Sequence, residues 1–256
     1  MDVESMHRRE HAIVAGGASG IGSEVAGRLL KRGVAVTVLD INPLGAAALD
    51  APPGRLEVIE TDITDADAVD TAFHTAEERI GPVNRLVVSA GAHGQLLNTV
   101  HLDLPAWQHL MDVHVRGTLL LAQAFGSRLL SADRHRAQDA SMVSIGSTTG
   151  ITASRKQGDY GPAKAALAQL TRVLAMEWAE AGIRANTVAP GQTLTPFVES
   201  MVANGYDLSE TERRTPLGRL ARVDEVASVI EFLLLDATYV TGVVLPVDGG
   251  WTALGR

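Results

Sequence analysis

Short apolar runs alternate along the chain with longer segments of helical periodicity. The runs, rich in valine, isoleucine and leucine, lie near residues 12–15, 34–39, 56–60, 84–90, 141–146, 183–189 and 242–247. The segments whose apolar residues recur at helical spacing lie near residues 20–32, 65–80, 103–130, 160–180 and 223–235. Continuous apolar strands joined by helices are typical of a parallel sheet that is covered on both faces. The pattern therefore predicts an α/β fold, a doubly wound parallel sheet of about seven strands.

The chain has 256 residues, and α/β folds of this length commonly form one domain. No break in composition divides it, so we expect residues 11–256 to form a single domain after a flexible N-terminal segment, residues 1–10. That segment is charged and lacks the apolar stretch of a signal peptide, and no uninterrupted apolar run reaches about 18 residues. We therefore expect a cytoplasmic protein with no membrane partner.

Charge and cysteine content narrow the chemistry. The net charge of −8 argues against a nucleic-acid partner, because phosphate binding requires clustered lysine and arginine. Cysteine is absent, which excludes disulfides and thiolate chemistry. We assign no metal site, and the expected partner is a small molecule.

A glycine-rich stretch joins the first predicted strand to the first predicted helix. Glycines at this junction permit a tight turn, let the backbone approach a pyrophosphate, and let the helix pack closely on the strand. The start of the helix then offers unpaired N–H groups to the phosphates. An ordinary loop is the alternative, but a strand, a glycine loop, a helix and a second strand in this order favour dinucleotide binding. The residues expected at the cofactor are Gly16, Ser19, Gly20, Ile21 and Gly22.

Asp40 ends the second predicted strand. A carboxylate at this position can accept hydrogen bonds from both hydroxyls of an adenosine ribose, and it repels a 2′-phosphate. Alternatively, Asp40 caps the turn that follows. The first interpretation predicts NAD rather than NADP as the cofactor.

Tyr160 and Lys164 stand four residues apart at the start of a long helical segment, so they share one face of the helix. A nearby ammonium favours the phenolate, so we expect the pKa of Tyr160 to lie below its ordinary value of about 10. Ser147 follows the fifth apolar run and could reach the same sheet edge. The alternative is an exposed helix start, in which Tyr160 covers a core and Lys164 is a surface charge.

Taken together, these motifs resemble the short-chain dehydrogenase/reductase family, in its compact single-domain branch. The glycines follow the family's TGxxxGxG spacing, with Ala15 in place of the threonine, and Ser147, Tyr160 and Lys164 match its serine and YxxxK. Further matches lie at residues 188–195 and 247–250, so the resemblance covers nearly the whole chain. It implies a Rossmann-like catalytic domain with a lid over the substrate near residues 192–215.

The resemblance also implies roles for individual residues. Tyr160 would be the general acid/base, Ser147 would bond the reacting oxygen, and Lys164 would hold the nicotinamide ribose. Asp62 resembles an adenine-contacting residue, although it could equally cap the helix that begins near residue 65. The remaining residues that the resemblance places at the cofactor are Ile63, Ala90, Gly91, Pro190, Gly191, Thr193 and Thr195.

Two positions depart from the family pattern. Val88 and Ser89 replace two asparagines, while the small pair Ala90 and Gly91 is kept. His114 stands where the family has an asparagine that is assigned to a proton relay leading to the lysine. His114 is either a member of such a relay or a histidine on a packed helix face. A relay role would add an ionisation to the rate of alcohol oxidation at roughly pH 6–7.

We therefore expect an NAD-dependent oxidoreductase that interconverts a secondary alcohol and a ketone. One alternative is an NADPH-dependent β-keto or acyl reductase of a biosynthetic pathway, although Ala18 and Ser19 stand where such enzymes carry a basic residue. Another is a dinucleotide-binding protein with little turnover. The resemblance also suggests a homotetramer or homodimer that pairs the helices near residues 103–130 and 160–180, although a helix buried in a monomer would show the same apolar pattern.

Overall fold

The structure, a computed structural model, describes residues 10–131, 139–203, 205 and 207–254. The segment that the sequence predicts to be flexible, residues 1–10, lies outside this description except for Glu10. Glu10 is held rather than free, since its carboxylate accepts a hydrogen bond of 2.6 Å from the Arg85 guanidinium.

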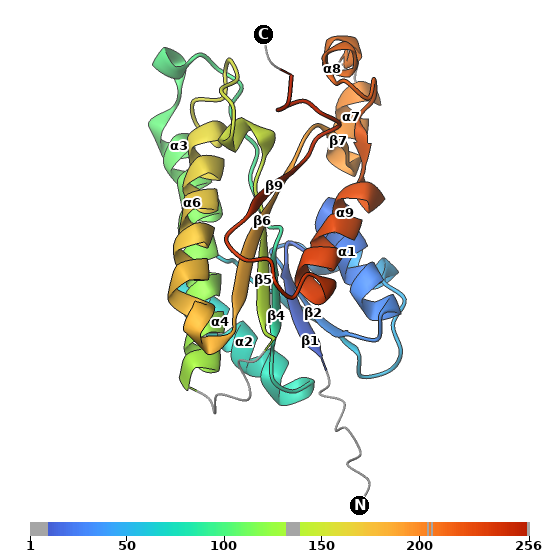
Figure 1. The fold of residues 1–256 in the computed structure, drawn as a ribbon, viewed down its shortest axis with the longest axis vertical. Helices are drawn as coiled ribbons and strands as arrows, with labels where there is room; N and C mark the ends of the chain where they lie inside the picture. Colours follow the sequence, from blue (N-terminus) through green and yellow to red (C-terminus); the bar gives the residue numbers. More distant parts are fainter. Residues whose placement is uncertain (1–9, 132–138, 204, 206, 255–256) are drawn as a thin grey trace, which may run out of the picture.

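Seven parallel strands form one sheet in the order β3-β2-β1-β4-β5-β6-β9, with helices on both faces (Figure 1). The predicted doubly wound fold is confirmed. Each strand lies within about two residues of its predicted position. The strands are β1 (His11–Ala15), β2 (Ala35–Asp40), β3 (Leu56–Glu60), β4 (Arg85–Val88), β5 (Ser141–Ile145), β6 (Arg184–Pro190) and β9 (Val244–Val247).

Two apolar cores lie on opposite faces of the sheet. On one face, α1 (Gly20–Lys31) packs beside α9 (Val223–Glu231), which continues as a π-helix, η6 (Phe232–Asp236). The other face is covered by α2 (Ala66–Arg79), α4 (Gly117–Ser131) and α6 (Tyr160–Trp178), whose large side chains Phe73, Phe125 and Trp178 fill the core (Figure 1). The strand order reverses between β1 and β4, where ligands bind in doubly wound sheets.

The helical segment predicted over residues 103–130 is interrupted. After η2 (Thr99–His101), α3 (Leu104–Met111) passes into a π-helical turn, η3 (Asp112–Arg116), before α4 begins. Turns of this kind are frequent at functional sites. Here the turn carries His114.

The segment predicted to form a lid contains two short helices, α7 (Pro196–Ala203) and α8 (Ser209–Arg214). Asn204 and Tyr206 lie outside the described residues. Before α7, β7 (Thr193–Leu194) pairs with β8 (Ala221–Arg222) in a separate two-stranded sheet. A 3-10 helix, η1 (Pro43–Ala48), follows β2.

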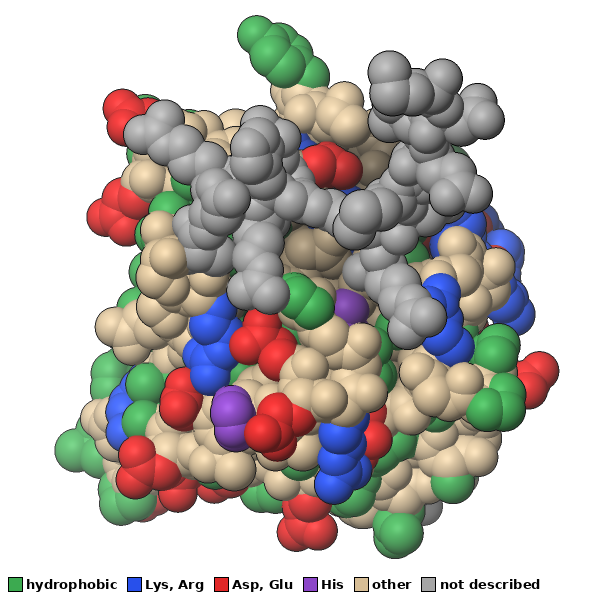
Figure 2. All heavy atoms as spheres, turned by 90° about the horizontal axis from the view of Figure 1, so that it is seen from below, with side chains coloured by type: hydrophobic (Ala, Val, Ile, Leu, Met, Phe, Trp, Pro, Cys, Tyr) green, Lys and Arg blue, Asp and Glu red, His purple; other side chains and the backbone are tan. Residues whose placement is uncertain are grey.

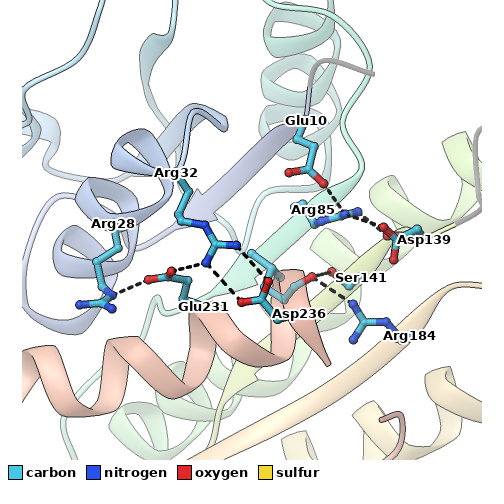
Figure 3. Close-up of polar contacts among 10 residues, drawn as sticks. Glu10, Arg28, Arg32, Arg85, Asp139, Ser141, Arg184, Glu231 and Asp236 are labelled. Atoms are coloured by element: carbon cyan, nitrogen blue, oxygen red, sulfur yellow. Dashed lines mark hydrogen bonds and ion pairs between the residues drawn. The ribbon is translucent and has the colours of Figure 1, made fainter. Parts of the chain in front are cut away.

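Two buried arginines brace the amino edge of the sheet, opposite the glycine loop. Arg85, with 2% of its side chain exposed, binds Glu10 and Asp139. Arg184 donates hydrogen bonds of 2.6 and 3.0 Å to the carbonyls of Leu233 and Leu234, within η6. Figure 3 shows both arginines among their partners. Seen from this end, basic and acidic side chains are interspersed over the visible part of the surface (Figure 2).

Arg85→Ala is expected to lower the free energy of unfolding by about 3 kcal/mol, because it leaves a cavity and removes the partner of two carboxylates. Arg79→Ala is a matched control, since the Arg79 side chain is 59% exposed and its one ion pair among the described residues is with Glu57. It should cost less than about 1 kcal/mol. Urea denaturation of both variants measures the difference, and equal losses would contradict a bracing role for Arg85.

Candidate active site

The glycine loop is packed too tightly to carry side chains at two of its glycines. At Gly16, with φ of +77°, an added Cβ would lie 2.3 Å from the backbone nitrogen of Ala90, after β4. At Gly22 it would lie 2.0 Å from the carbonyl oxygen of Gly16. The loop is thereby pressed against the ends of β1 and β4, and α1 can start directly above the sheet edge.

Gly20 presents open space instead. Its φ is +53°, and the nearest atoms to an added Cβ would belong to Thr195, at 3.8 Å or more. Ser19 caps α1 by its backbone alone, and Ile21 is half-buried. A helix start beside a glycine that leaves open space fits the pyrophosphate of a dinucleotide.

Asp40 ties the glycine loop to the end of β2. Its Oδ2 accepts a hydrogen bond of 3.1 Å from the Ala18 N–H, and its Oδ1 accepts one of 3.0 Å from the Asn42 N–H. The carboxylate therefore caps the turn that follows β2, which was the alternative role for Asp40. Each carboxylate oxygen can accept more than one hydrogen bond, so these contacts leave acceptor capacity for the two hydroxyls of a ribose.

Asp62 does not cap α2. Its carboxylate accepts two hydrogen bonds of 2.8 Å from the backbone and side chain of Thr64, which hold the pKa of Asp62 below its ordinary value. Asp65 is the cap, with bonds from two N–H groups of α2. The capping alternative is therefore wrong, and the exposed Asp62 remains a candidate contact for adenine. Ile63 is buried against Gly117 at the start of α4.

The backbone after β4 lies directly over the π-helical turn. The N–H groups of Ser89 and Ala90 both donate to the carbonyl of Ala15, at 2.8 Å. An added Cβ at Gly91 would lie 2.7 Å from Cε1 of His114. The small pair Ala90 and Gly91 therefore brings this backbone close to both the glycine loop and His114.

His114 is buried beneath this backbone. Its Nε2 lies 2.9 Å from the carbonyl oxygen of Ala92, and its ring meets the Tyr160 ring edge-on, with the centroids 5.4 Å apart. Burial, helped by the charge of Lys164, lowers the pKa of His114 to about 3. The prediction that His114 ionises at roughly pH 6–7 is therefore wrong, because the imidazole is neutral in that range.

Ser147, Tyr160 and Lys164 converge at the carboxyl edge of the sheet. Ser147 follows β5 and begins η4 (Thr148–Gly150), and its side chain hydrogen-bonds the Tyr160 side chain. Tyr160 begins α6, and the Lys164 Nζ lies 5.5 Å from the centroid of its ring. Lys164 is only 4% exposed and donates a hydrogen bond of 2.7 Å to the Ile145 carbonyl. The alternative of a surface lysine is wrong.

Burial sets the pKa values of this set. It raises the pKa of Tyr160 to about 12, although the bond with Ser147 acts in the opposite direction, and it lowers the pKa of Lys164 to about 7. The prediction of a lowered tyrosine pKa is therefore wrong for this arrangement. Removal from water disfavours the phenolate and the ammonium alike, and here it outweighs their attraction.

The end of β6 forms the next part of the same edge. Pro190 ends the strand, and the Gly191 N–H donates to the Val247 carbonyl, at 3.0 Å. The buried Thr193 donates to the Gly191 carbonyl, at 3.1 Å. The Thr195 hydroxyl accepts a hydrogen bond of 3.4 Å from a backbone N–H of α7, while its methyl carbon faces Gly20. These residues thus lie beside the glycine loop.

Comparison with known proteins gives the family. A family model described as enoyl-(acyl carrier protein) reductase matches residues 16–252. The structure superposes on that of a short-chain type dehydrogenase/reductase from Mycobacterium ulcerans with a TM-score of 0.87 and 31% identity, covering 95% of this chain and 90% of the other. The chain belongs to the short-chain dehydrogenase/reductase family.

Two relatives of this short-chain dehydrogenase/reductase are similar to it over nearly their full length. Cis-4-hydroxycyclohexanecarboxylate dehydrogenase of Sinomonas cyclohexanicum is 37% identical, covering 95% of this chain and 96% of the relative. Galactitol 2-dehydrogenase (L-tagatose-forming) of Cereibacter sphaeroides is 34% identical, covering 98% and 99%. The chain is accordingly an oxidoreductase that uses a nicotinamide dinucleotide.

Two residues beside Ser147 and Tyr160 of this short-chain dehydrogenase/reductase, Thr149 and Asp159, were not predicted as part of the site. The Thr149 hydroxyl lies 2.9 Å from the Ser147 Oγ, and Asp159, directly before the tyrosine, is buried. An aspartate at a predicted helix start was a visible signal for a cap, whereas nothing in the sequence marked Thr149.

In the described part of the chain, no helix is long and apolar enough to span a membrane, and no group of His, Cys, Asp or Glu is placed to hold a metal ion.

Proposed function

We propose that the protein is an NAD-dependent oxidoreductase that interconverts a secondary alcohol and a ketone. The observation that carries this proposal is the half-buried Tyr160 side chain, whose hydroxyl is hydrogen-bonded to Ser147 and whose ring is close to Lys164, at the sheet edge that also holds the glycine loop. The dehydrogenase names of the relatives support the same class of reaction.

Tyr160 would move the proton. With a pKa of about 12 it is a phenol at neutral pH, so it can donate its proton to the oxygen of a ketone and must recover one in the reverse direction. Ser147 would bond the same oxygen. Lys164, with a pKa of about 7, carries a positive charge for part of the time and then stabilises the phenolate. The nicotinamide supplies or accepts the hydride.

The other edge residues would hold the cofactor. The glycine loop and the start of α1 (Gly16, Ser19, Gly20, Ile21, Gly22) would bind the pyrophosphate, and Asp40 the adenosine ribose. Asp62 and Ile63 would border the adenine, with Ala90 and Gly91 along the ribose. Tyr160 and Lys164 would bind the nicotinamide ribose, and Pro190, Gly191, Thr193 and Thr195 would border the nicotinamide under a lid formed by α7 and α8.

Initial rates with NAD and NADP would test the proposal. Suitable alcohols are cis-4-hydroxycyclohexanecarboxylate, galactitol and D-threitol, which appear in the names of relatives. A β-ketoacyl thioester with NADPH tests the acyl-reductase alternative. Oxidation of an alcohol with NAD is the expected result. Tight NAD binding without turnover of any substrate would instead indicate a dinucleotide-binding protein.

His114 would position the backbone rather than exchange protons. Its Nε2 lies against Ala92, and its neutral ring packs on Tyr160. The alternative relay, running through this residue to Lys164, would use the backbone or a neutral imidazole. In either case the pH profiles of oxidation for wild type and His114→Asn should superimpose at roughly pH 6–7.

His114→Asn is also expected to improve acid resistance. The unfolded histidine titrates near pH 6.5 and the folded one near 3, so the unfolded state binds more protons between these values. The contribution of His114 to stability is therefore lost progressively as the pH falls through this window, whereas asparagine does not titrate. Urea unfolding near pH 5 and near pH 7.5 should show a smaller loss in the variant than in wild type. The exposed His74→Asn is the control, and an equal loss in all three proteins would contradict the lowered pKa.

A homotetramer or homodimer is part of the proposal. A groove of about 620 Å³ runs between α2, α4 and α6, and apolar side chains beside it are exposed. Met176 on α6 is 79% exposed, and Leu119 and Leu130 on α4 are also exposed. Pairing of these helices across two copies would cover them. Sedimentation that shows only monomer in dilute solution would remove this part of the proposal.

A further inference from the structure

Asp159 joins the catalytic helix to a distant segment. Its side chain lies immediately before Tyr160 and is 0% exposed. The Oδ1 atom accepts a hydrogen bond of 2.7 Å from the Tyr160 N–H, and Oδ2 accepts one of 2.7 Å from the Gln95 N–H. One carboxylate therefore fixes the first residue of α6 to the stretch that follows β4, residues 91–98.

This arrangement differs from an ordinary helix cap. Asp65, the cap of α2, accepts both of its bonds, at 2.9 and 3.1 Å, from N–H groups of its own helix. Asp159 accepts one bond from Tyr160 and the other from Gln95, a residue 64 positions earlier in the chain. A buried carboxylate is costly unless its oxygens are hydrogen-bonded. The N–H groups of Tyr160 and Gln95 are therefore both held against the Asp159 carboxylate.

Residues 91–98 are held at three points. His114 contacts Ala92, and Asp159 holds Gln95. The Gln95 side chain in turn bonds the backbone of Asp103 in both directions, at 2.9 and 3.1 Å, before α3. Between the first two points, an added Cβ at Gly94 would lie 3.2 Å from the Tyr160 Cβ and 2.9 Å from Asp159 Oδ1. The segment therefore packs directly on the catalytic tyrosine.

We propose that Asp159 is a positioning residue for the reaction: it fixes the tyrosine and residues 91–98 relative to each other. This inference rests on the proposed function, in which Tyr160 bonds the reacting oxygen. A segment packed on the tyrosine borders the space where the alcohol must lie. Loss of the bridge lets the segment and the phenol shift independently, and a misplacement of roughly 1 Å can cost on the order of a hundredfold in rate.

Two variants separate the bridge from the helix cap. Asp159→Asn keeps the shape, but its amide nitrogen is a donor and opposes one of the two N–H groups. Asp159→Ser keeps a good capping residue at the start of α6, but one short hydroxyl cannot reach both donors. Asp65→Asn is the matched control, because asparagine caps a helix as well as aspartate does.

The experiment uses the full chain, with NAD and an alcohol from the panel above that turns over. For both Asp159 variants we expect kcat at saturating alcohol to fall by about tenfold or more, with the dissociation constant of NAD unchanged. Hydrogen exchange should become faster in residues 91–98 and stay unchanged in α1. Asp65→Asn should match wild type in every measurement. Melting temperatures identify a variant that has not folded. If Asp159→Asn does not fold, kcat and hydrogen exchange of Asp159→Ser decide whether the positioning role holds.

The outcomes also separate this inference from the proposed function. Wild-type kcat in the folded Asp159 variants, with turnover abolished in Tyr160→Phe, overturns the positioning role and leaves the proposed function intact. A lowered melting temperature with unchanged kcat reduces Asp159 to a structural cap and likewise overturns it. If Tyr160→Phe keeps its activity, the proposed function has failed, and unchanged exchange in residues 91–98 then overturns the bridge as well.

Discussion

Tyr160→Phe is expected to lower alcohol turnover by about 10²–10⁴-fold, because it removes the proton carrier. The phenylalanine ring can keep the edge-on contact with His114, whose centroid lies 5.4 Å away, so the fold should be retained. Only the hydroxyl and its bond with Ser147 are lost. Steady-state kcat and the dissociation constant of NAD, measured separately, should show a collapse of the first with little change in the second.

Tyr239→Phe is the control for this prediction, because Tyr239 is fully exposed, at 103%. It loses the same hydroxyl far from the sheet edge and should leave the rate unchanged. Lys164→Ala, in contrast, should weaken cofactor binding as well as turnover. Comparable activity in Tyr160→Phe and wild type would place the general base elsewhere.

Wild-type protein is expected to prefer NAD to NADP by roughly a hundredfold or more, and Asp40→Ala should narrow this ratio. A carboxylate that faces a 2′-phosphate adds like-charge repulsion and forfeits its bonds to the ribose. The Asp40 side chain also holds the Ala18 N–H at 3.1 Å, so the variant should bind NAD itself more weakly. Measuring kcat/KM for both cofactors in each protein gives the ratio.

Glu60→Ala is the matched control for the cofactor prediction. Glu60 is exposed and lies opposite Asp40 in the register of β2 and β3, but it makes no bond to the glycine loop among the described contacts. Equal narrowing in both variants would indicate a general effect of negative charge rather than direct contact with the ribose. A wild-type preference for NADP would show that Asp40 does not face the ribose.

The sheet could be predicted because its central strands are buried on both faces and are therefore mostly apolar, as in β1 and β2. The π-helical turn at His114 could not, since one turn changes the helical period too briefly to alter the pattern of apolar residues. The convergence of Ser147, Tyr160 and Lys164 followed from helical spacing and from the shared sheet edge.

The pKa values could not be predicted in the same way. The spacing of Tyr160 and Lys164 indicates that they are close, but it says nothing of how much water the fold excludes. The attraction between the two groups favours a lowered tyrosine pKa, but burial dominates both pKa values. The same limit applies to His114, whose pKa is lowered mainly by burial and further by the charge of Lys164.

The buried lysine has a consequence for how this sequence is maintained. Its pKa is 10.5 in the unfolded chain and about 7 in the fold, so between these values the unfolded state holds the proton more strongly. The free energy of unfolding therefore rises with pH across that window, and at pH 7 and below the fold bears the full cost of burying an ammonium. Selection for stability alone would replace Lys164 with an apolar residue of similar length. The lysine opposes folding at its own position, and its proposed catalytic role supplies a reason for its presence there.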